Sequence, residues 1–230
     1  AQQSIRTLSA YIYSSCGWGE STQDLVFAGN AFGKESMSRK SLYTMMRAQE
    51  MTDTIESDIE YPVFAGKKDL NKEVEKQVFA GYKMFKAETK PLSDGRLYYG
   101  VTCAPVVSND EFVSVLFTAY AYAGGANGET HLFSLTYSPR DKEFLSVTEA
   151  TGLSLEALSK LCAEKLSSIL PSPDAELIKS GTAPKTENFQ NFTFDGSLLT
   201  VYFEPYEVAP HSAGVVKVEI PVGAVPYSEK

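Results

Sequence analysis

The chain has 230 residues, 43% of them hydrophobic and 22% charged, a composition typical of a folded protein with a sizeable core. Its formal net charge of −8 argues against a nucleic-acid-binding surface and is compatible with a basic partner. No run approaches the roughly 18 apolar residues of a membrane helix, so we expect no membrane span in this chain. Because the first residue is Ala1 rather than Met, a removed signal or lipid anchor is compatible with the sequence.

The cysteines and histidines do not form the clusters that metal sites need. Cys16, Cys103 and Cys162 include no C-x-x-C pair, and His131 and His211 have no H-E-x-x-H or H-x-x-H spacing. We therefore expect no metal and no cofactor. Cys162 is predicted to be buried on the apolar face of a helix. A Cys16–Cys103 disulfide in an oxidising compartment is left open.

Residues 1–50 form an N-terminal segment of unclear role, within which residues 41–49 are compatible with either a helix or a strand. Apolar and acidic residues alternate over residues 55–61, which predicts a strand with an acidic outer face. A helix is expected next, with Asp69 as its N-cap and an apolar stripe that continues to Phe85.

A meander of strands is predicted after this helix. Residues 97–107 and 111–123 are expected to pair about a turn at Asn109-Asp110. The glycine-rich segment 124–128 is expected to be the loop that leads into another strand at residues 131–137. Glycine allows a close approach of the backbone to a ligand, so this loop is either a binding loop or a plain hairpin turn.

A second amphipathic helix is predicted to begin after Ser154, a favourable N-cap, and to end before Pro171 and Pro173. Residues 171–188 are polar and are predicted to be irregular. Asp195-Gly196 then indicates a hairpin turn.

The stretch from Leu198 to Pro221 is expected to form two strands joined by a stiff turn. Apolar and polar residues alternate on both sides of the turn, and Pro205 and Pro210 fix the backbone between them. The order strand, helix, strands, helix, strands predicts an α+β fold, with two main helices packed on one face of a mostly antiparallel sheet.

Two kinds of candidate site follow from side-chain chemistry. Glu56, Asp58 and Glu60 fall on one strand face, where they are either a general acid/base pair or a solvated face that keeps the strand soluble. Aromatic rings stack on sugars and anchor interfaces, and Tyr206 is predicted to be exposed in the stiff turn. The turn and the glycine loop are predicted to form one binding surface that comprises Pro205, Tyr206, Glu207, Pro210, His211, Gly124, Gly125 and Asn127.

The C-terminal stretch also carries a family resemblance. Its Phe203, Pro205-Tyr206-Glu207-Val208-Ala209-Pro210, Gly214 and Val218-x-Ile220-Pro221 resemble the signature of an uncharacterised extracytoplasmic domain family. That family is found in the ectodomain of the lysozyme-sensing anti-sigma factor RsiV and in the non-catalytic part of PdaC-type peptidoglycan deacetylases.

Two further stretches extend the resemblance toward the N-terminus. Tyr61-Pro62-Val63 and the helix from Asn71 look like the smaller module that precedes the family's main domain, and Phe112 to Ala126 looks like its strand and glycine turn. The chain departs from the family at Asn127, where members commonly have His, and at His211, where they often have an aromatic residue.

The resemblance implies a smaller α+β module at residues 51–107 and an RsiV-like domain at residues 108–230, packed as one unit. It also implies an extracytoplasmic, non-enzymatic binding module, either periplasmic, secreted or lipid-anchored. The expected partner is a basic protein such as lysozyme or a peptidoglycan-type glycan. A cell-wall carbohydrate hydrolase or a deacetylase-associated domain with a carboxylate pair is the alternative, and a structural or assembly protein is a third hypothesis.

Overall fold

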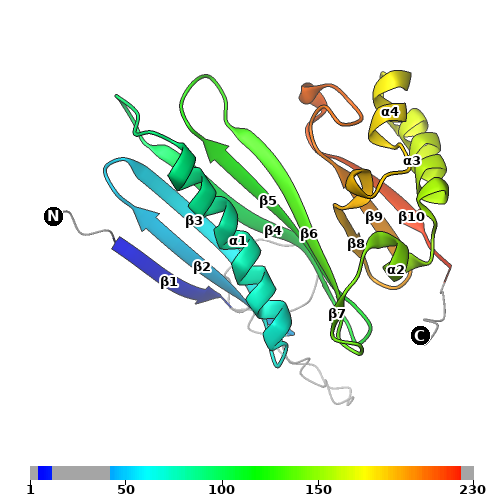
Figure 1. Cartoon of the computed structure of the whole chain (residues 1–230), viewed down its shortest axis with the longest axis horizontal. Coiled ribbons are helices and arrows are strands. Elements are labelled where there is room, and N and C mark those ends of the chain that lie inside the picture. Colours follow the sequence, from blue (N-terminus) through cyan, green and yellow to red (C-terminus); the bar gives the residue numbers. More distant parts are fainter. Residues whose placement is uncertain (1–4, 12–41, 224–230) are drawn as a thin grey trace, which may run out of the picture.

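The computed structural model describes residues 5–11 and 42–223 (Figure 1). Its larger layer is a seven-stranded sheet with the strands in chain order, antiparallel at every pairing except β3 with β4. The strands are β1 (Ile5–Tyr11), β2 (Tyr43–Met51), β3 (Ile55–Phe64), β4 (Leu97–Ser108), β5 (Val113–Tyr122), β6 (Glu129–Ser138) and β7 (Glu143–Phe144).

The parallel pairing of β3 with β4 requires a crossover, which α1 (Lys68–Glu88) provides. The apolar stripe of α1 lies on β3 and β4 because its buried residues recur at helical spacing: Leu70, Val74, Val78, Tyr82 and Phe85. Together with the facing side of the sheet, this stripe forms the first hydrophobic core. Within the described part of the chain, no helix is long and apolar enough to cross a membrane.

The second layer is a three-stranded antiparallel sheet in the order β10-β9-β8. Its strands are β8 (Phe192–Phe194), β9 (Leu198–Phe203) and β10 (Val216–Pro221). Its helical segments are α2 (Val147–Thr151), α3 (Leu155–Ile169), α4 (Ala175–Gly181), η1 (Thr186–Phe189) and η2 (His211–Ala213). Helix α3 packs against β10 and α4, and its buried Leu158, Cys162 and Leu166 belong to a second hydrophobic core.

Strand β8 joins the two layers through serine side chains of the larger sheet. The hydroxyl of Ser114 on β5 accepts the N–H of Phe194 at 3.2 Å, and the hydroxyl of Ser134 on β6 accepts the N–H of Phe192 at 3.0 Å. Ser114 and Thr136 also share a buried hydrogen bond of 2.7 Å. The backbone N–H groups of Phe192 and Phe194 on this edge strand therefore find their acceptors in the larger sheet.

The α+β class with a mostly antiparallel sheet is confirmed. The prediction of two main helices on one face is not confirmed, because α1 covers the seven-stranded sheet and α3 covers the three-stranded one (Figure 1). The division into residues 51–107 and 108–230 stays a prediction. The β4–β5 hairpin crosses residue 107, so the larger sheet continues on both sides of that boundary.

Two local expectations need correction. Asp69 is not the N-cap of α1: Lys67 is, without a side-chain bond, and Asp69 lies in the first turn. The nearby Asn71 side chain bonds both the N–H and the C=O of Phe64, which joins the helix start to β3. Residues 171–188 are not irregular, since they include α4 and η1, and the Asp174 carboxylate caps α4. A helix of seven residues offers too little periodicity to detect.

Other local predictions hold. Ser154 caps α3 by accepting the N–H of Ala157, and Cys162 is fully buried. In the stretch 41–49, for which the sequence favours neither conformation, residues 43–49 form part of strand β2. Cys16 lies outside the described residues, so the proposed disulfide stays open.

Candidate functional site

The β9–β10 turn carries most of the predicted binding residues. Two backbone hydrogen bonds hold the turn. The N–H of Tyr206 donates to Ala209 O at 3.1 Å, and the N–H of Glu207 donates to Glu204 O at 3.1 Å. Buried Val208 and Ala209 anchor the turn in the second core. Tyr206 itself has a φ of +73° and a side chain that is 66% exposed, so the turn projects this ring into solvent.

A second aromatic ring accompanies Tyr206. His211 at the start of η2 is exposed, and its ring centroid lies 5.2 Å from that of Tyr206. Pro205 is half-buried and Pro210 exposed. Glu207 is exposed as a residue, but partial desolvation of its carboxyl raises its pKa. The nearby Glu204 charge adds to the rise, while the hydrogen bond with the Glu204 backbone opposes it. Exposed tyrosine side chains are enriched at protein interfaces, because they combine a large apolar ring with a polar group.

The glycine loop between β5 and β6 presents the remaining predicted residues. Gly124 and Gly125 have φ values of +98° and +100°, which side-chain-bearing residues rarely adopt. A Cβ on Gly124 would also lie 2.7 Å from the Leu92 side chain. Tyr122 donates its hydroxyl to Gly125 O at 3.1 Å, which fixes the loop, and Asn127 is exposed at its tip.

Glu204 connects strand β6, which begins at the end of the glycine loop, to the β9–β10 turn. Its carboxylate accepts the N–H of Leu132 at 2.5 Å and lies 3.7 Å from Nδ1 of His131. The other ring nitrogen of His131 lies 3.6 Å from Glu129. Both loops consequently lie at the same end of the molecule, at the top of Figure 1. Glu204 and His131 were not predicted as site residues. The only sequence signal for Glu204 is its position directly before Pro205 of the turn, and no signal indicates His131.

An aromatic strip continues from the glycine loop onto the sheet face opposite α1. Tyr120 is 40% exposed, and its ring centroid lies 6.1 Å from that of Tyr98 on β4. A Cβ on Gly128 would lie 2.5 Å from the Tyr120 ring, so the ring rests against the loop backbone. Tyr98 in turn lies opposite Glu56 of β3 in the strand register.

The acidic strand face is an ion-pair network rather than a freely solvated surface. The guanidinium of Arg47 on β2 contacts both carboxylate oxygens of Asp58 and lies 3.6 Å from Glu60. All three carboxylates of this face are half-buried. Because one arginine holds two of them, a structural role explains the cluster. Over the residues that the structure describes, no group of three His, Cys, Asp or Glu residues is arranged to hold a metal ion.

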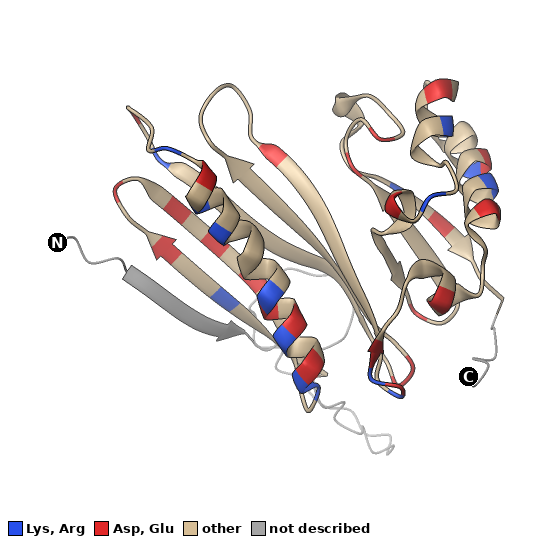
Figure 2. Ribbon diagram, viewed as in Figure 1, with Lys and Arg blue, Asp and Glu red and all other residues tan. Residues whose placement is uncertain are grey.

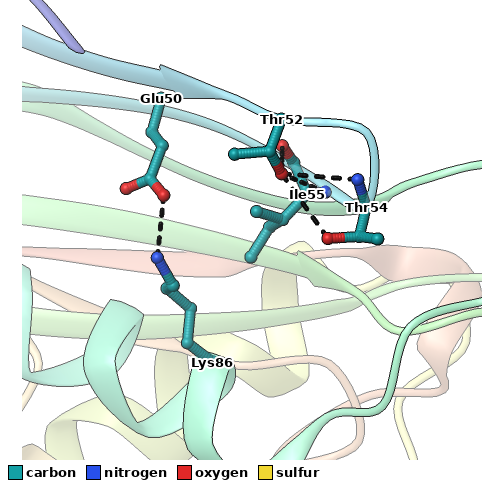
Figure 3. Close-up of polar contacts among 5 residues, drawn as sticks. All are labelled: Glu50, Thr52, Thr54, Ile55 and Lys86. Carbon is teal, nitrogen blue, oxygen red and sulfur yellow. Dashed lines mark hydrogen bonds and ion pairs between the residues drawn. The ribbon is translucent and has the colours of Figure 1, made fainter. Parts of the chain in front are cut away.

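A groove of about 820 Å³ lies beside α1, over strands β2 and β3. Its end near the C-terminus of α1 contains the buried Glu50 carboxylate, which accepts a hydrogen bond of 2.8 Å from Lys86 (Figure 3). The Thr52 hydroxyl accepts N–H groups of Thr54 and Ile55 close by, which holds the β2–β3 turn. Sequence reasoning did not find this groove, because Glu50 and Lys86 are separated by 36 positions.

The fold places the chain among α+β proteins with a mostly antiparallel sheet, and comparisons of sequence define the class further. Residues 48–130 match the family model described as Deacetylase PdaC, and residues 151–223 match the model described as Protein of unknown function (DUF3298). The predicted resemblance to this family is confirmed.

One curated relative is the peptidoglycan-N-acetylmuramic acid deacetylase PdaC of Bacillus subtilis (strain 168). It is 30% identical over 173 residues, which cover 70% of this chain and 36% of that protein. The chain therefore spans about a third of the length of this relative.

Two solved structures share the fold. A DUF3298-family protein from Bacteroides fragilis superposes with a TM-score of 0.56 at 19% identity, over 78% of this chain and 89% of that one. A DUF3298-family protein from Pseudomonas aeruginosa PAO1 superposes with a TM-score of 0.51 at 16% identity, over 95% of this chain and 90% of that one.

Proposed function

We propose that this chain is a non-catalytic, extracytoplasmic binding module that recognises a peptidoglycan-type glycan. Its similarity to a protein named as a peptidoglycan-N-acetylmuramic acid deacetylase supports the ligand class. The observation that carries the proposal is the exposure of Tyr206, which is 66% exposed. Backbone hydrogen bonds within the turn hold this residue in place, and the His211 ring lies beside its ring. An exposed, rigid ring offers the face on which sugars stack.

The surrounding groups supply polar contacts for such a ligand. Glu207 and Asn127 can bond sugar hydroxyls and amides, because a carboxylate accepts and an amide both donates and accepts. Gly125 lies exposed in the glycine loop, where the backbone can approach a ligand without a side chain in between. Pro205 and Pro210 stiffen the turn and keep its groups in place, and Gly124 allows the glycine loop its positive φ.

The test is the Tyr206→Ala variant in a sedimentation assay with purified, insoluble peptidoglycan. We expect about ten-fold weaker binding, since base or sugar stacking on one ring contributes roughly 1–3 kcal/mol by analogy with nucleic acids. Tyr206→Phe keeps the ring and should bind like the original chain. Met84→Ala, which removes a 62% exposed side chain from α1, is the control for general surface change. Equal binding by Tyr206→Ala and Met84→Ala would remove the turn from the site.

A basic protein such as lysozyme is a second candidate, favoured by carboxylates at the same end of the molecule. Glu129 and Glu207 are exposed, and the whole chain carries a formal charge of −8. Complementary charge accelerates encounter, but salt screens it. Titration with hen lysozyme at low and at physiological salt separates the cases: micromolar binding that survives salt supports this partner, whereas binding at low salt alone indicates nonspecific attraction.

A further inference from the structure

We propose that the groove beside α1 is a second binding site, separate from the two loops, and that it takes an acidic peptide in an extended conformation. The groove lies between the exposed side of α1 and the part of β2 and β3 that the helix does not cover. Nothing in the glycan proposal requires it, since the turn at Tyr206 belongs to the other layer of the fold (Figure 1).

The rim of the groove is a row of lysines on one side of α1. Lys72, Lys76, Lys83 and Lys86 all line it. Their spacings of four, seven and three place them along one helical stripe. At 1.5 Å per residue, the row extends for about 21 Å, the length of roughly six residues of extended peptide.

The charge of this row is opposite to that of the molecule. Four lysines face two carboxylates of the lining, Glu50 and Glu75, although the chain as a whole carries −8. Figure 2 shows basic residues recurring along α1 with acidic residues between them. Lys76 also lies 3.0 Å from Glu73, but its side chain is 69% exposed, and such pairs exchange partners at little cost. The row therefore favours a ligand that carries several negative charges.

The apolar floor of the groove favours binding of a peptide over binding of a fully charged polymer such as polyphosphate. Ala48, Ile59, Phe79 and Ala80 present apolar surface between the lysines and the strands. A polyphosphate would place charged groups against this apolar surface. Those groups would lose their hydration without forming compensating hydrogen bonds or ion pairs. An extended peptide directs alternate side chains to opposite sides, so small apolar residues can contact the floor while acidic residues reach the lysines.

The end of the groove near the C-terminus of α1 holds a buried polar group without a hydrogen-bond partner of good geometry among the described residues. The Tyr82 hydroxyl is buried and, among the described residues, has no hydrogen-bond partner of good geometry, although Ser57 and Glu50 lie near enough to influence its pKa. The Lys86 ammonium lies 5.2 Å from the centre of the Tyr82 ring. A ligand carboxylate here can accept from the exposed Lys86 ammonium. If the groove opens slightly at this end, the same carboxylate also reaches the buried Tyr82 hydroxyl and gives that donor a partner.

The probe is the fluorescein-labelled hexapeptide Glu-Ala-Glu-Ala-Glu-Ala with an amidated C-terminus, measured by fluorescence anisotropy at physiological salt on the full chain. We expect it to bind at least ten-fold more tightly than the Gln-Ala hexapeptide of the same length. The variant with Lys72→Gln, Lys76→Gln and Lys83→Gln should lose at least ten-fold in affinity. Its matched control carries Lys160→Gln, Lys179→Gln and Lys185→Gln, three exposed lysines of the other layer, and should bind like the original chain.

Tyr82→Phe is the second variant, because it removes the hydroxyl and keeps the ring in the core. We expect about five-fold weaker peptide binding with thermal stability unchanged or higher, a combination that a purely structural role would not produce. Equal affinity for the Glu and Gln peptides, equal loss in both lysine variants, or tighter binding of polyphosphate than of the peptide would overturn the proposal. Tyr206→Ala should leave peptide affinity unchanged, so the two proposals can fail independently.

Discussion

Single residues in this protein are held by partners from distant elements, and Glu50 is an example. Its carboxylate is buried at the α1–β2 boundary and accepts a hydrogen bond from Lys86. That hydrogen bond, which outweighs the effect of burial, raises the pKa of Lys86 above its ordinary value. A charge removed from water is tolerated only with such compensation, so this contact should matter more than the exposed Lys76–Glu73 pair.

Lys86→Met should lower the free energy of unfolding by about 1–3 kcal/mol, because the buried Glu50 carboxylate loses its ammonium partner. Urea denaturation at pH 7 measures the change. The raised pKa of Lys86 means that its contribution is present below about pH 10.4 and is lost as the pH rises through the folded-state pKa, so the variant should show a shallower alkaline loss of stability.

Lys83→Met is the matched control, since Lys83 is an exposed residue of the same helix. A double variant with Glu50→Gln and Lys86→Met should recover part of the lost stability, because a neutral amide replaces the buried carboxylate. Equal stability of the Lys86→Met and Lys83→Met variants would show that the pair contributes little.

At the scale of elements, short turns with polar caps set the geometry of the second layer. The Asp195 carboxylate accepts the N–H groups of Ser197 at 2.8 Å and Leu198 at 2.7 Å, and it also accepts the Ser197 hydroxyl. Burial opposes ionisation of Asp195, but these hydrogen bonds outweigh it and lower the pKa of the carboxyl. Gly196 follows with a φ of +100°, so side chain and backbone both specify the β8–β9 hairpin.

Asp195→Ala should destabilise the protein by about 1–2 kcal/mol through the loss of these bonds, whereas Asp195→Asn should lose less because its amide oxygen still accepts. Denaturation curves at several pH values measure both. The lowered pKa means that the contribution is present above about pH 3.9 and is lost as the pH falls through the folded-state pKa. An alanine variant as stable as the asparagine one at pH 7 would contradict this role.

At the scale of the whole molecule, the two layers are joined by hydroxyl groups rather than by a continuous sheet. Ser114 and Ser134 accept backbone N–H groups of β8, and Asn109 donates to Asp195 O at 2.9 Å near the same boundary. A small apolar contact of Leu116, Leu132 and Tyr202 lies beside them. The relative position of the two loops at the candidate site depends on this junction.

Ser114→Ala together with Ser134→Ala should destabilise the chain by about 2–4 kcal/mol, because two N–H groups of β8 lose their acceptors. The more specific result is faster hydrogen exchange at the amides of Phe192 and Phe194, measured by NMR, with α1 amides less affected. The control replaces Ser167 and Ser168, exposed serines of α3, with alanine. Uniform acceleration of exchange in both layers would contradict a local junction.

Much of the fold could be predicted from the sequence because its signals are local. The alternation over residues 55–61 and the apolar stripe that ends at Phe85 are properties of neighbouring residues, and both elements form. The Asp195-Gly196 hairpin is specified in the same way. The short α4 helix was missed because its seven residues complete barely two turns.

The sequence by itself determined the α+β class, the family resemblance and the rigid turn that exposes Tyr206, since each depends on residues close together in the chain. Only the tertiary structure decided that β6 and the β9–β10 turn meet through Glu204 and Leu132, which are 72 positions apart. It also decided that Glu50, Tyr82 and the lysines of α1 surround one groove. The physical reason is that such contacts arise from how packed layers place distant elements, which no local period or spacing encodes.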